Sequence, residues 1–232
     1  MAPELYVREV EKALMPLADS AKAEKMRAYL LGQFEFLGLP APVRRDAVKP
    51  LSGCQWHSSG DLLSAAHMLW NKPEREYRYT AIDLLRRHDR CLQPADLSVI
   101  RQLLLRDAWW ETVDGLTAVI GAVLRAQLKS VDDPEALMDQ WIVDSNFWVR
   151  RCAMLHQLGW RLDTNAKRLF AYAESLADEK EFFIRKAIGW ALRDYSRWNP
   201  EAVSHFVREK RGVLSGLTAR EAVRRLPAPL DG

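Results

Sequence analysis

Apolar residues recur at every third or fourth position along nearly the whole chain. This spacing is typical of amphipathic helices, and no segment shows the alternation of apolar and polar residues that marks a half-buried strand. Prolines and glycines lie between the periodic segments, as at Gly38, Pro134 and Asn199-Pro200. The pattern therefore predicts an all-α protein of roughly ten to twelve helices with short connections.

An aromatic residue opens four of the predicted helices, at intervals of 33, 38 and 35 residues: Tyr77, Trp110, Trp148 and Phe183. Residues 147–152 and 182–187 match closely, since both run aromatic, aromatic, aliphatic, basic, basic, small. Such periods are typical of helix-pair repeats, because one pair cannot cover its own apolar face and must stack on its neighbour. The variable interval favours a HEAT-like solenoid of stacked antiparallel helix pairs with a concave groove. We expect one such domain over residues 1–232.

Several classes of protein are disfavoured by the composition. No apolar run approaches the roughly 20 residues needed to cross a bilayer, and the N-terminal segment has no secretory apolar stretch. The three cysteines and five histidines show neither disulfide nor metal-ligand spacing. We therefore expect an intracellular protein with no membrane association, no metal and no cofactor, and a monomer by default.

The net charge of +3 is unevenly distributed. Residues 145–232 hold 16 Lys and Arg against 10 Asp and Glu, whereas residues 1–144 hold 18 against 21. A basic C-terminal half permits a nucleic-acid partner without requiring one, because a solvated basic surface gives the same count.

The predicted helix that begins near Trp109 has a side that a hydrophobic core does not explain. Its core stripe is complete without that side: Trp109, Thr112, Leu116, Val119, Ile120 and Val123. The opposite side carries Trp110, Asp114, Ala118, Gly121 and Arg125. Trp110 lies one turn before Asp114, and small residues follow, which suits a site that a ligand approaches closely. The alternative is that Trp110 packs against the next repeat and Asp114 caps a helix or forms a salt bridge.

The predicted helix that begins near Phe183 repeats this arrangement. One stripe is apolar (Ile184, Ile188, Ala191 and Tyr195), and the opposite stripe carries Lys186, Trp190, Arg193 and Arg197. Such a face suits a groove where cations meet phosphates and an indole meets a sugar or base, or an ordinary solvated surface. On the helix between them, Arg151 lies among apolar residues and needs an anionic partner, either an internal carboxylate or a phosphate.

Longer strings of residues resemble the AlkD-type DNA alkylation-repair glycosylases. They are Leu-Trp-Asn-Lys-Pro-Glu-Arg-Glu-Tyr at 69–77, Trp-Trp-Glu-Thr-Val-Asp at 109–114, Asp-Ser-Asn-Phe-Trp-Val-Arg-Arg at 144–151 and the segment 180–195, with shorter matches at 26–29, 34–38 and 217–222. The resemblance runs in order along nearly the whole chain. It implies a HEAT-like fold that holds duplex DNA and hydrolyses the N-glycosidic bond of cationic N3- and N7-alkylated purines. It also implies base excision repair without base flipping, and a location in the cytoplasm at the nucleoid of a prokaryote.

The resemblance assigns roles to single residues. Asp114 matches the catalytic carboxylate, and Trp110 and Trp190 match the tryptophans of the active cleft. Arg151 matches a DNA-contacting arginine, and Tyr29 matches a further residue of the cleft. Lys186 and Arg193 are expected to contact phosphates, which would position the DNA without reading its sequence. Glu111 departs from the aspartate usual in this string, but it keeps the charge.

Two alternatives remain at this point. A non-catalytic relative would keep the basic groove and bind DNA of unusual shape, and a protein-interaction scaffold would use the same solenoid for protein partners. Asp114 argues against the first, and the family motifs argue against the second.

Overall fold

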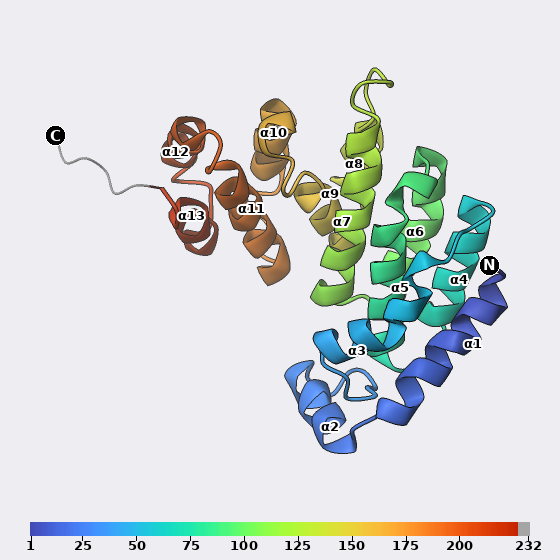
Figure 1. The fold of residues 1–232 in the computed structure, drawn as a ribbon. Helices are drawn as coiled ribbons and strands as arrows, with labels where there is room; N and C mark the ends of the chain where they lie inside the picture. The colour runs from blue at the N-terminus through green and yellow to red at the C-terminus, as the bar shows by residue number, and fades with distance from the viewer. Residues whose placement is uncertain (227–232) are drawn as a thin grey trace. The chain divides into compact units, whose positions relative to one another are not determined.

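The computed structural model describes residues 1–226, and this part of the chain is all-α (Figure 1). It contains thirteen α-helices and five short 3-10 helices, and its one β feature is an isolated bridge between Glu35 and Glu74. The predicted fold class is therefore confirmed. The predicted count of ten to twelve helices was slightly too low, because short helices such as α8 (Ala136–Trp141) give too little periodicity to detect.

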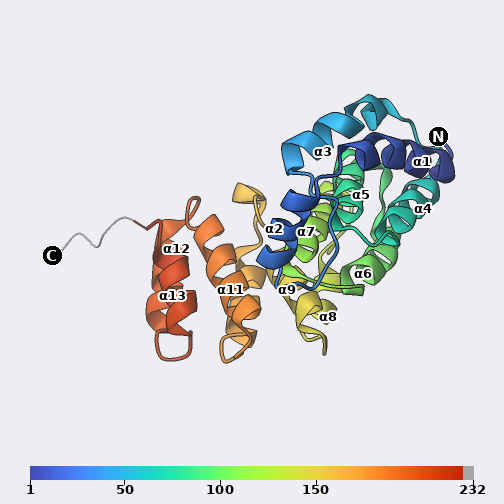
Figure 2. The same ribbon diagram turned by 90° about the horizontal axis from the view of Figure 1, so that it is seen from below.

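The described chain divides into two compact units, with the boundary after Arg106. In the first unit, α4 packs against three other helices, α1, α5 and α6 (Figure 2). The large side chains Leu62, Leu69 and Trp70 of α4 are fully buried there. The helices of this unit are α1 (Pro3–Leu14), α2 (Ser20–Tyr29), α3 (Ala41–Val48), α4 (Ser59–Trp70), α5 (Arg75–Arg87) and α6 (Leu97–Leu105).

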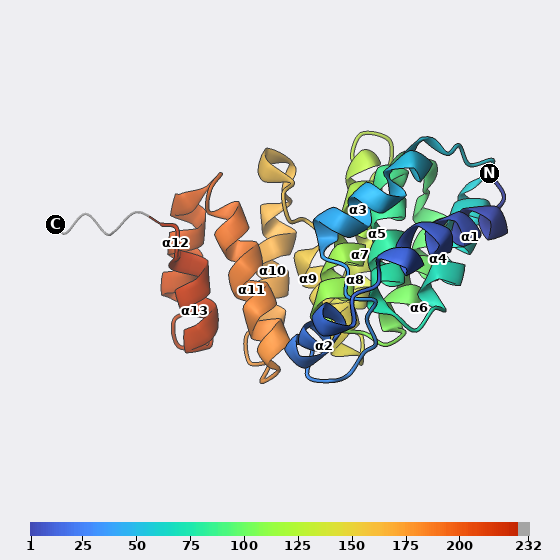
Figure 3. The same cartoon turned by 60° about the horizontal axis from the view of Figure 1, so that its bottom comes forward.

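The second unit begins at Asp107 and is built from successive helix pairs. Its helices are α7 (Trp110–Ala126), α8, α9 (Phe147–Leu155), α10 (Ala166–Ser175), α11 (Phe182–Tyr195), α12 (Pro200–Glu209) and α13 (Gly216–Val223). The odd-numbered helices form a row in which α9 packs against α7 and α11, and α11 packs against α13. The even-numbered helices pack beside this row. For example, α12 packs against α11 and α13 (Figure 3). This is the predicted stacking of helix pairs, whereas a single domain over residues 1–232 stays a prediction.

Polar side chains fix where the helices of the second unit begin. The amide oxygens of Asn146, Asn165 and Asn199 and the hydroxyl of Ser215 each accept a backbone N–H in the first turn of the helix that follows. These bonds satisfy donors that a helix N-terminus leaves unpaired. Asn199-Pro200 begins α12 as the sequence predicts, because a proline at the first helical position has no N–H to satisfy.

Two glycines let neighbouring helices of the row approach closely. A Cβ on Gly121 of α7 would lie 2.1 Å from the backbone oxygen of His156, and one on Gly189 of α11 would lie 2.5 Å from Cβ of Glu221. Gly121 is buried. The small residue therefore does allow a close approach, as its place opposite the core stripe suggests, but at Gly121 the group that approaches is the C-terminal end of α9.

No helix within residues 1–226 combines the length and the apolar character needed to cross a membrane. Over the same residues, no three His, Cys, Asp or Glu side chains come together in a way that would hold a metal ion. Cys54, Cys91 and Cys152 are free thiols.

Candidate functional site

Aromatic rings at the beginnings of three helices contact one another, in tilted and edge-on arrangements, in the second unit. The ring of Trp109 lies 6.0 Å from Trp148 and 5.4 Å from Phe183, and Trp148 lies 4.9 Å from Phe183, measured between ring centroids. These rings stand at the N-terminal ends of α7, α9 and α11. Two aromatic residues of the sequence repeat, Trp148 and Phe183, thus contact each other and Trp109, the residue before the repeat position Trp110.

Asp114 and Arg151 form a two-point ion pair between α7 and α9. Nε of Arg151 donates to Oδ1 of Asp114 and Nη2 donates to Oδ2, both at 2.8 Å. The Arg151 side chain is only 5% exposed and the Asp114 side chain 17%. Paired planar groups of this kind are strong and geometrically specific. The anionic partner that Arg151 needs is thus an internal carboxylate.

A third group holds Arg151 in place from the next helix. Its Nη1 donates to the backbone oxygen of Phe183 at 2.5 Å, and its guanidinium carbon lies 5.9 Å from the centre of the Phe183 ring. Arg151 therefore links α7, α9 and α11, and its three hydrogen bonds fix the orientation of the Asp114 carboxylate.

Burial raises the pKa of the Asp114 carboxyl above its ordinary value of 3.8. The hydrogen bonds from Arg151 act in the opposite direction, and the charge of Glu111 acts in the same direction as burial. Burial likewise raises the pKa of the Cys152 thiol on α9 to about 12, and the charge of Asp114 acts in the same direction. The thiol is therefore neutral near pH 7 and is not a nucleophile, since only the thiolate reacts.

The other residues expected in the active cleft lie on different elements. Trp110 lies one turn before Asp114 on α7, and Trp190 lies two turns after Phe183 on α11; both are half-buried. Tyr29 is the last residue of α2 in the first unit, with 72% of its surface exposed. Their place in one cleft stays a prediction.

Lys186 and Arg193 of α11 are partly exposed, and each already has a carboxylate partner. Both form ion pairs with Glu221 of α13, with 2.9 Å between Nζ of Lys186 and Oε1 of Glu221. Glu221 lowers the net charge that Lys186 and Arg193 together offer to a phosphate from +2 to +1. The predicted contacts of Lys186 and Arg193 with DNA stay a prediction.

Sequence reasoning missed three contributors to the environment of Asp114. From the sequence, Phe183 is recognised only as a helix-opening aromatic residue and Cys152 only as an incidental thiol. Glu111 is recognised only as a departure from the family string that has little consequence. The helical spacing of three places Glu111 beside Asp114 and was available from the sequence. The contact of the Phe183 carbonyl with Arg151 had no signal, because any residue type supplies a carbonyl.

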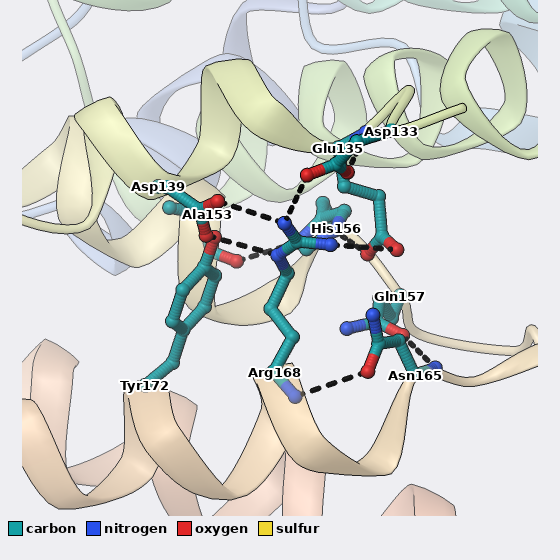
Figure 4. Close-up of polar contacts among 9 residues, drawn as sticks. All are labelled: Asp133, Glu135, Asp139, Ala153, His156, Gln157, Asn165, Arg168 and Tyr172. Atoms are coloured by element: carbon teal, nitrogen blue, oxygen red, sulfur yellow. Dashed lines mark hydrogen bonds and ion pairs between the residues drawn. The ribbon is translucent and has the colours of Figure 1, made fainter. Parts of the chain in front are cut away.

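A second polar cluster, also unpredicted, lies between α8, α9 and α10 (Figure 4). Nε2 of His156 lies 2.7 Å from Glu135, and Arg168 bonds to Glu135, Asp139 and Asp133. The Glu135 and His156 side chains are almost fully buried, at 3% and 1% exposure. The hydrogen bonds from Arg168 keep the pKa of Asp139 below its usual range. The charged groups of this cluster pair with one another and join three helices, so we regard the cluster as part of the scaffold.

A cavity of about 520 Å³ in the first unit holds none of the predicted site residues. Its charged lining residues are Arg45, Asp46, Lys49, Asp83, Arg86 and Arg87. The cations stand at the C-terminal ends of α3 and α5, where the helix dipole favours positive charge.

Comparison with known proteins points to one family. Residues 10–226 match the family described as DNA alkylation repair enzyme. A solved structure titled as a predicted DNA alkylation repair enzyme from Enterococcus faecalis is 32% identical, covers 90% of this chain and 96% of its own, and has a TM-score of 0.82. AlkD2 from Streptococcus mutans is 17% identical over 98% of this chain and 100% of its own, with a TM-score of 0.62, and so supports the fold alone. No curated protein matches the chain.

Proposed function

Because the chain belongs to the DNA alkylation repair enzyme family, we propose that it is a DNA glycosylase for cationic N3- and N7-alkylated purines in duplex DNA. The observation that carries the proposal is the buried two-point pair of Arg151 with Asp114. The pair lies near the N-terminal ends of α7, α9 and α11, where the aromatic rings contact one another. A carboxylate held in this way is suited to stabilising positive charge that develops during a reaction.

Alkylation leaves the purine positively charged, so that it departs without a strong acid. In the proposed reaction the bond between C1′ and the purine N9 breaks, and its electron pair neutralises the base. The sugar becomes an oxocarbenium ion, to which a water adds at C1′ while releasing a proton. Asp114 stabilises the cationic sugar and orients this water. The bidentate bond to Arg151 uses one lone pair on each carboxylate oxygen, which leaves acceptor capacity for the water.

Trp110 and Trp190 are proposed to flank the sugar, because indole faces attract cationic groups. Both are half-buried rather than enclosed. This partial exposure supports excision without extrusion of the base into a pocket, unlike the many enzymes that flip their target. Lys186 and Arg193 are proposed to contact phosphates, with the backbone oxygens of DNA replacing Glu221. The protein would act as a cytoplasmic monomer without a cofactor.

The test is release of 7-methylguanine and 3-methyladenine from methylated duplex DNA. Asp114→Asn keeps the size of the side chain and removes its charge, so we expect a loss of about a hundredfold or more. Asp163→Asn is the matched control, because Asp163 forms an exposed ion pair with Arg125 in the same unit. We expect this variant to retain wild-type release.

Two outcomes would favour the alternatives. A wild-type protein that binds DNA but releases no base would indicate a non-catalytic DNA-binding protein. One that neither binds DNA nor releases base would indicate a protein-interaction scaffold.

A further inference from the structure

The cavity of about 520 Å³ in the first unit has the size of a small-molecule site. Residues of α1, of the 3-10 helix Lys49–Gly53 and of the C-terminal parts of α3 and α5 line it. Part of the lining is apolar, from Val48, Leu51 and Leu84. The cavity shares no lining residue with the surroundings of Asp114, which lies in the second unit.

The charged lining of the cavity has more cations than acids. Four cations and two acids give a formal charge of +2. Of the acids, Asp83 is already paired, because Arg44 donates to its Oδ2 at 2.7 Å and Arg45 at 3.0 Å. The C-terminal ends of α3 and α5 each add about half a negative charge, which leaves the cavity positive. Within residues 1–226, three of the lining cations have no carboxylate partner: Lys49, Arg86 and Arg87.

Two polar groups at the cavity wall are buried without a hydrogen-bond partner. Tyr6 of α1 is only 4% exposed, and within the described residues nothing bonds to its hydroxyl. Nε2 of His88 is buried and likewise has no partner in that part of the chain. Burial raises the pKa of Tyr6 and lowers the pKa of His88, so that both are uncharged near pH 7. Buried polar groups almost always have a partner, and these two therefore indicate a ligand.

The helix dipoles explain only part of this arrangement. They favour cations at the ends of α3 and α5, but they give no partner to a buried hydroxyl on α1. A ligand that satisfies both features is anionic and accepts hydrogen bonds. A phosphate group suits the cavity better than a carboxylate, because it offers a third acceptor oxygen and up to two negative charges.

We propose that this cavity binds a phosphate group. Its three unpaired cations hold the negative charge, and the Tyr6 hydroxyl donates to a phosphate oxygen. A free mononucleotide presents such a group and has a size that the cavity accommodates. A phosphate of the DNA backbone presents the same chemistry. The inference is independent of the proposed base release, which uses none of the lining residues.

The first experiment compares deoxyadenosine monophosphate with deoxyadenosine, which lacks only the phosphate, by isothermal titration calorimetry. We expect the wild type to bind the monophosphate with an affinity about tenfold or more above that of the nucleoside. Arg87→Gln and Tyr6→Phe should each weaken binding of the monophosphate about tenfold, because each removes a hydrogen bond to a charged group. Lys25→Gln removes a cation of α2 outside the cavity and should leave this binding unchanged.

The stability of Tyr6→Phe separates a role in binding from a role in the fold. A buried hydroxyl without a partner costs desolvation energy, so its removal should leave the midpoint of urea unfolding unchanged or raise it. A lowered midpoint together with wild-type binding of the monophosphate would show that the hydroxyl serves the fold and would overturn the role given to Tyr6.

Competition with an undamaged duplex identifies the source of the phosphate. If the duplex displaces the monophosphate and Arg87→Gln weakens binding of both, the cavity takes a phosphate of the DNA backbone. If the duplex and the monophosphate bind together, it takes a free nucleotide. Equal binding of monophosphate and nucleoside by the wild type would overturn the inference, as would a monophosphate affinity unaffected by Arg87→Gln. Base release is measured separately, so failure of the proposed glycosylase leaves this test intact.

Discussion

The second unit contains two ion-pair clusters that bridge neighbouring helices of the row, and they differ in the exposure of their cations. Asp114 and Arg151 join α7 to α9 through two parallel hydrogen bonds, with side chains 17% and 5% exposed. Glu221, with its side chain 15% exposed, joins α13 to α11 through Lys186 and Arg193, whose side chains are 38% and 20% exposed. Burial raises the pKa of Asp114, whereas hydrogen bonding to Lys186 lowers the pKa of Glu221.

The difference lies in how well water reaches the cation of each cluster. An exposed pair is screened by water and contributes little stability. A buried pair costs desolvation energy and is retained where a fixed, poorly screened charge serves a purpose. Of the two clusters, only the first combines a buried cation, two-point pairing and an aromatic ring beside the cation.

The largest expected effect comes from removing Arg151, and the comparison is with removal of Lys186 from the cluster of Glu221. Arg151→Ala leaves the Asp114 carboxylate buried without its partner, and we expect the free energy of unfolding to fall by about 3–5 kcal/mol at pH 7. Lys186→Ala should cost about 1 kcal/mol or less, because Arg193 still pairs with Glu221 and water replaces the lost contact. Urea unfolding of both variants provides the measurement. Equal losses would contradict the distinction between the clusters.

The repeated segments show which parts of this organisation the sequence could predict. In residues 147–152 and 182–187, the first basic residue has the same role in both copies. Arg150 donates to the backbone oxygen of Asp144 at 2.7 Å, and Arg185 donates to that of Glu179 at 2.7 Å, each six residues earlier. The spacing of the aromatic and apolar residues likewise predicted the helix pairs, because local period and local capping are properties of the chain itself.

The second basic residue of each segment marks the limit of that prediction. Arg151 reaches back to Asp114 on the preceding helix of the row, whereas Lys186 reaches forward to Glu221 on the following one. Nothing in the matching segments distinguishes these directions, because the partners lie 37 and 35 positions away. The same reason hid the cluster of Glu135, His156 and Arg168, whose members carry no common motif.

A medium effect is expected from filling the close approach between helices at Gly121, and a smaller one at Gly189. Gly121→Ala gains about 0.5–1 kcal/mol of helix preference. It also forces a methyl group against the backbone oxygen of His156, which has little freedom to move. We expect a net loss of about 1–3 kcal/mol of unfolding free energy. Thermal or urea unfolding measures it, and an unchanged or raised stability would show that α9 can shift away from α7.

Gly189→Ala is the matched variant beside the cluster of Glu221, Lys186 and Arg193. Its new methyl group would meet the Cβ of Glu221 and, at 3.0 Å, the backbone oxygen of Thr218 on α13. Because α13 is the last described helix of the row and packs only on α11 and α12 among the closer contacts, it can move more freely than α9. We expect a smaller loss than for Gly121→Ala, accompanied by weaker pairing of Glu221 with Lys186.

The smallest effect is a difference in pH dependence between the two acids. The lowered pKa of Glu221 adds stability that is present above its ordinary value of 4.5 and is lost as pH falls through the folded value. The raised pKa of Asp114 acts in the opposite sense, since the folded protein holds this proton more tightly than the unfolded chain does. Its contribution declines as pH rises from 3.8 through the folded value.

The stability of the wild type relative to Glu221→Gln should therefore increase from pH 3 to pH 6, by about 1 kcal/mol or less. Relative to Asp114→Asn it should decrease over the same range. Urea unfolding at several pH values gives both differences. Slopes of the same sign would mean that the hydrogen bonds from Arg151 outweigh burial at Asp114. The two clusters would then differ in exposure, but the pKa values of their carboxyl groups would be shifted in the same direction.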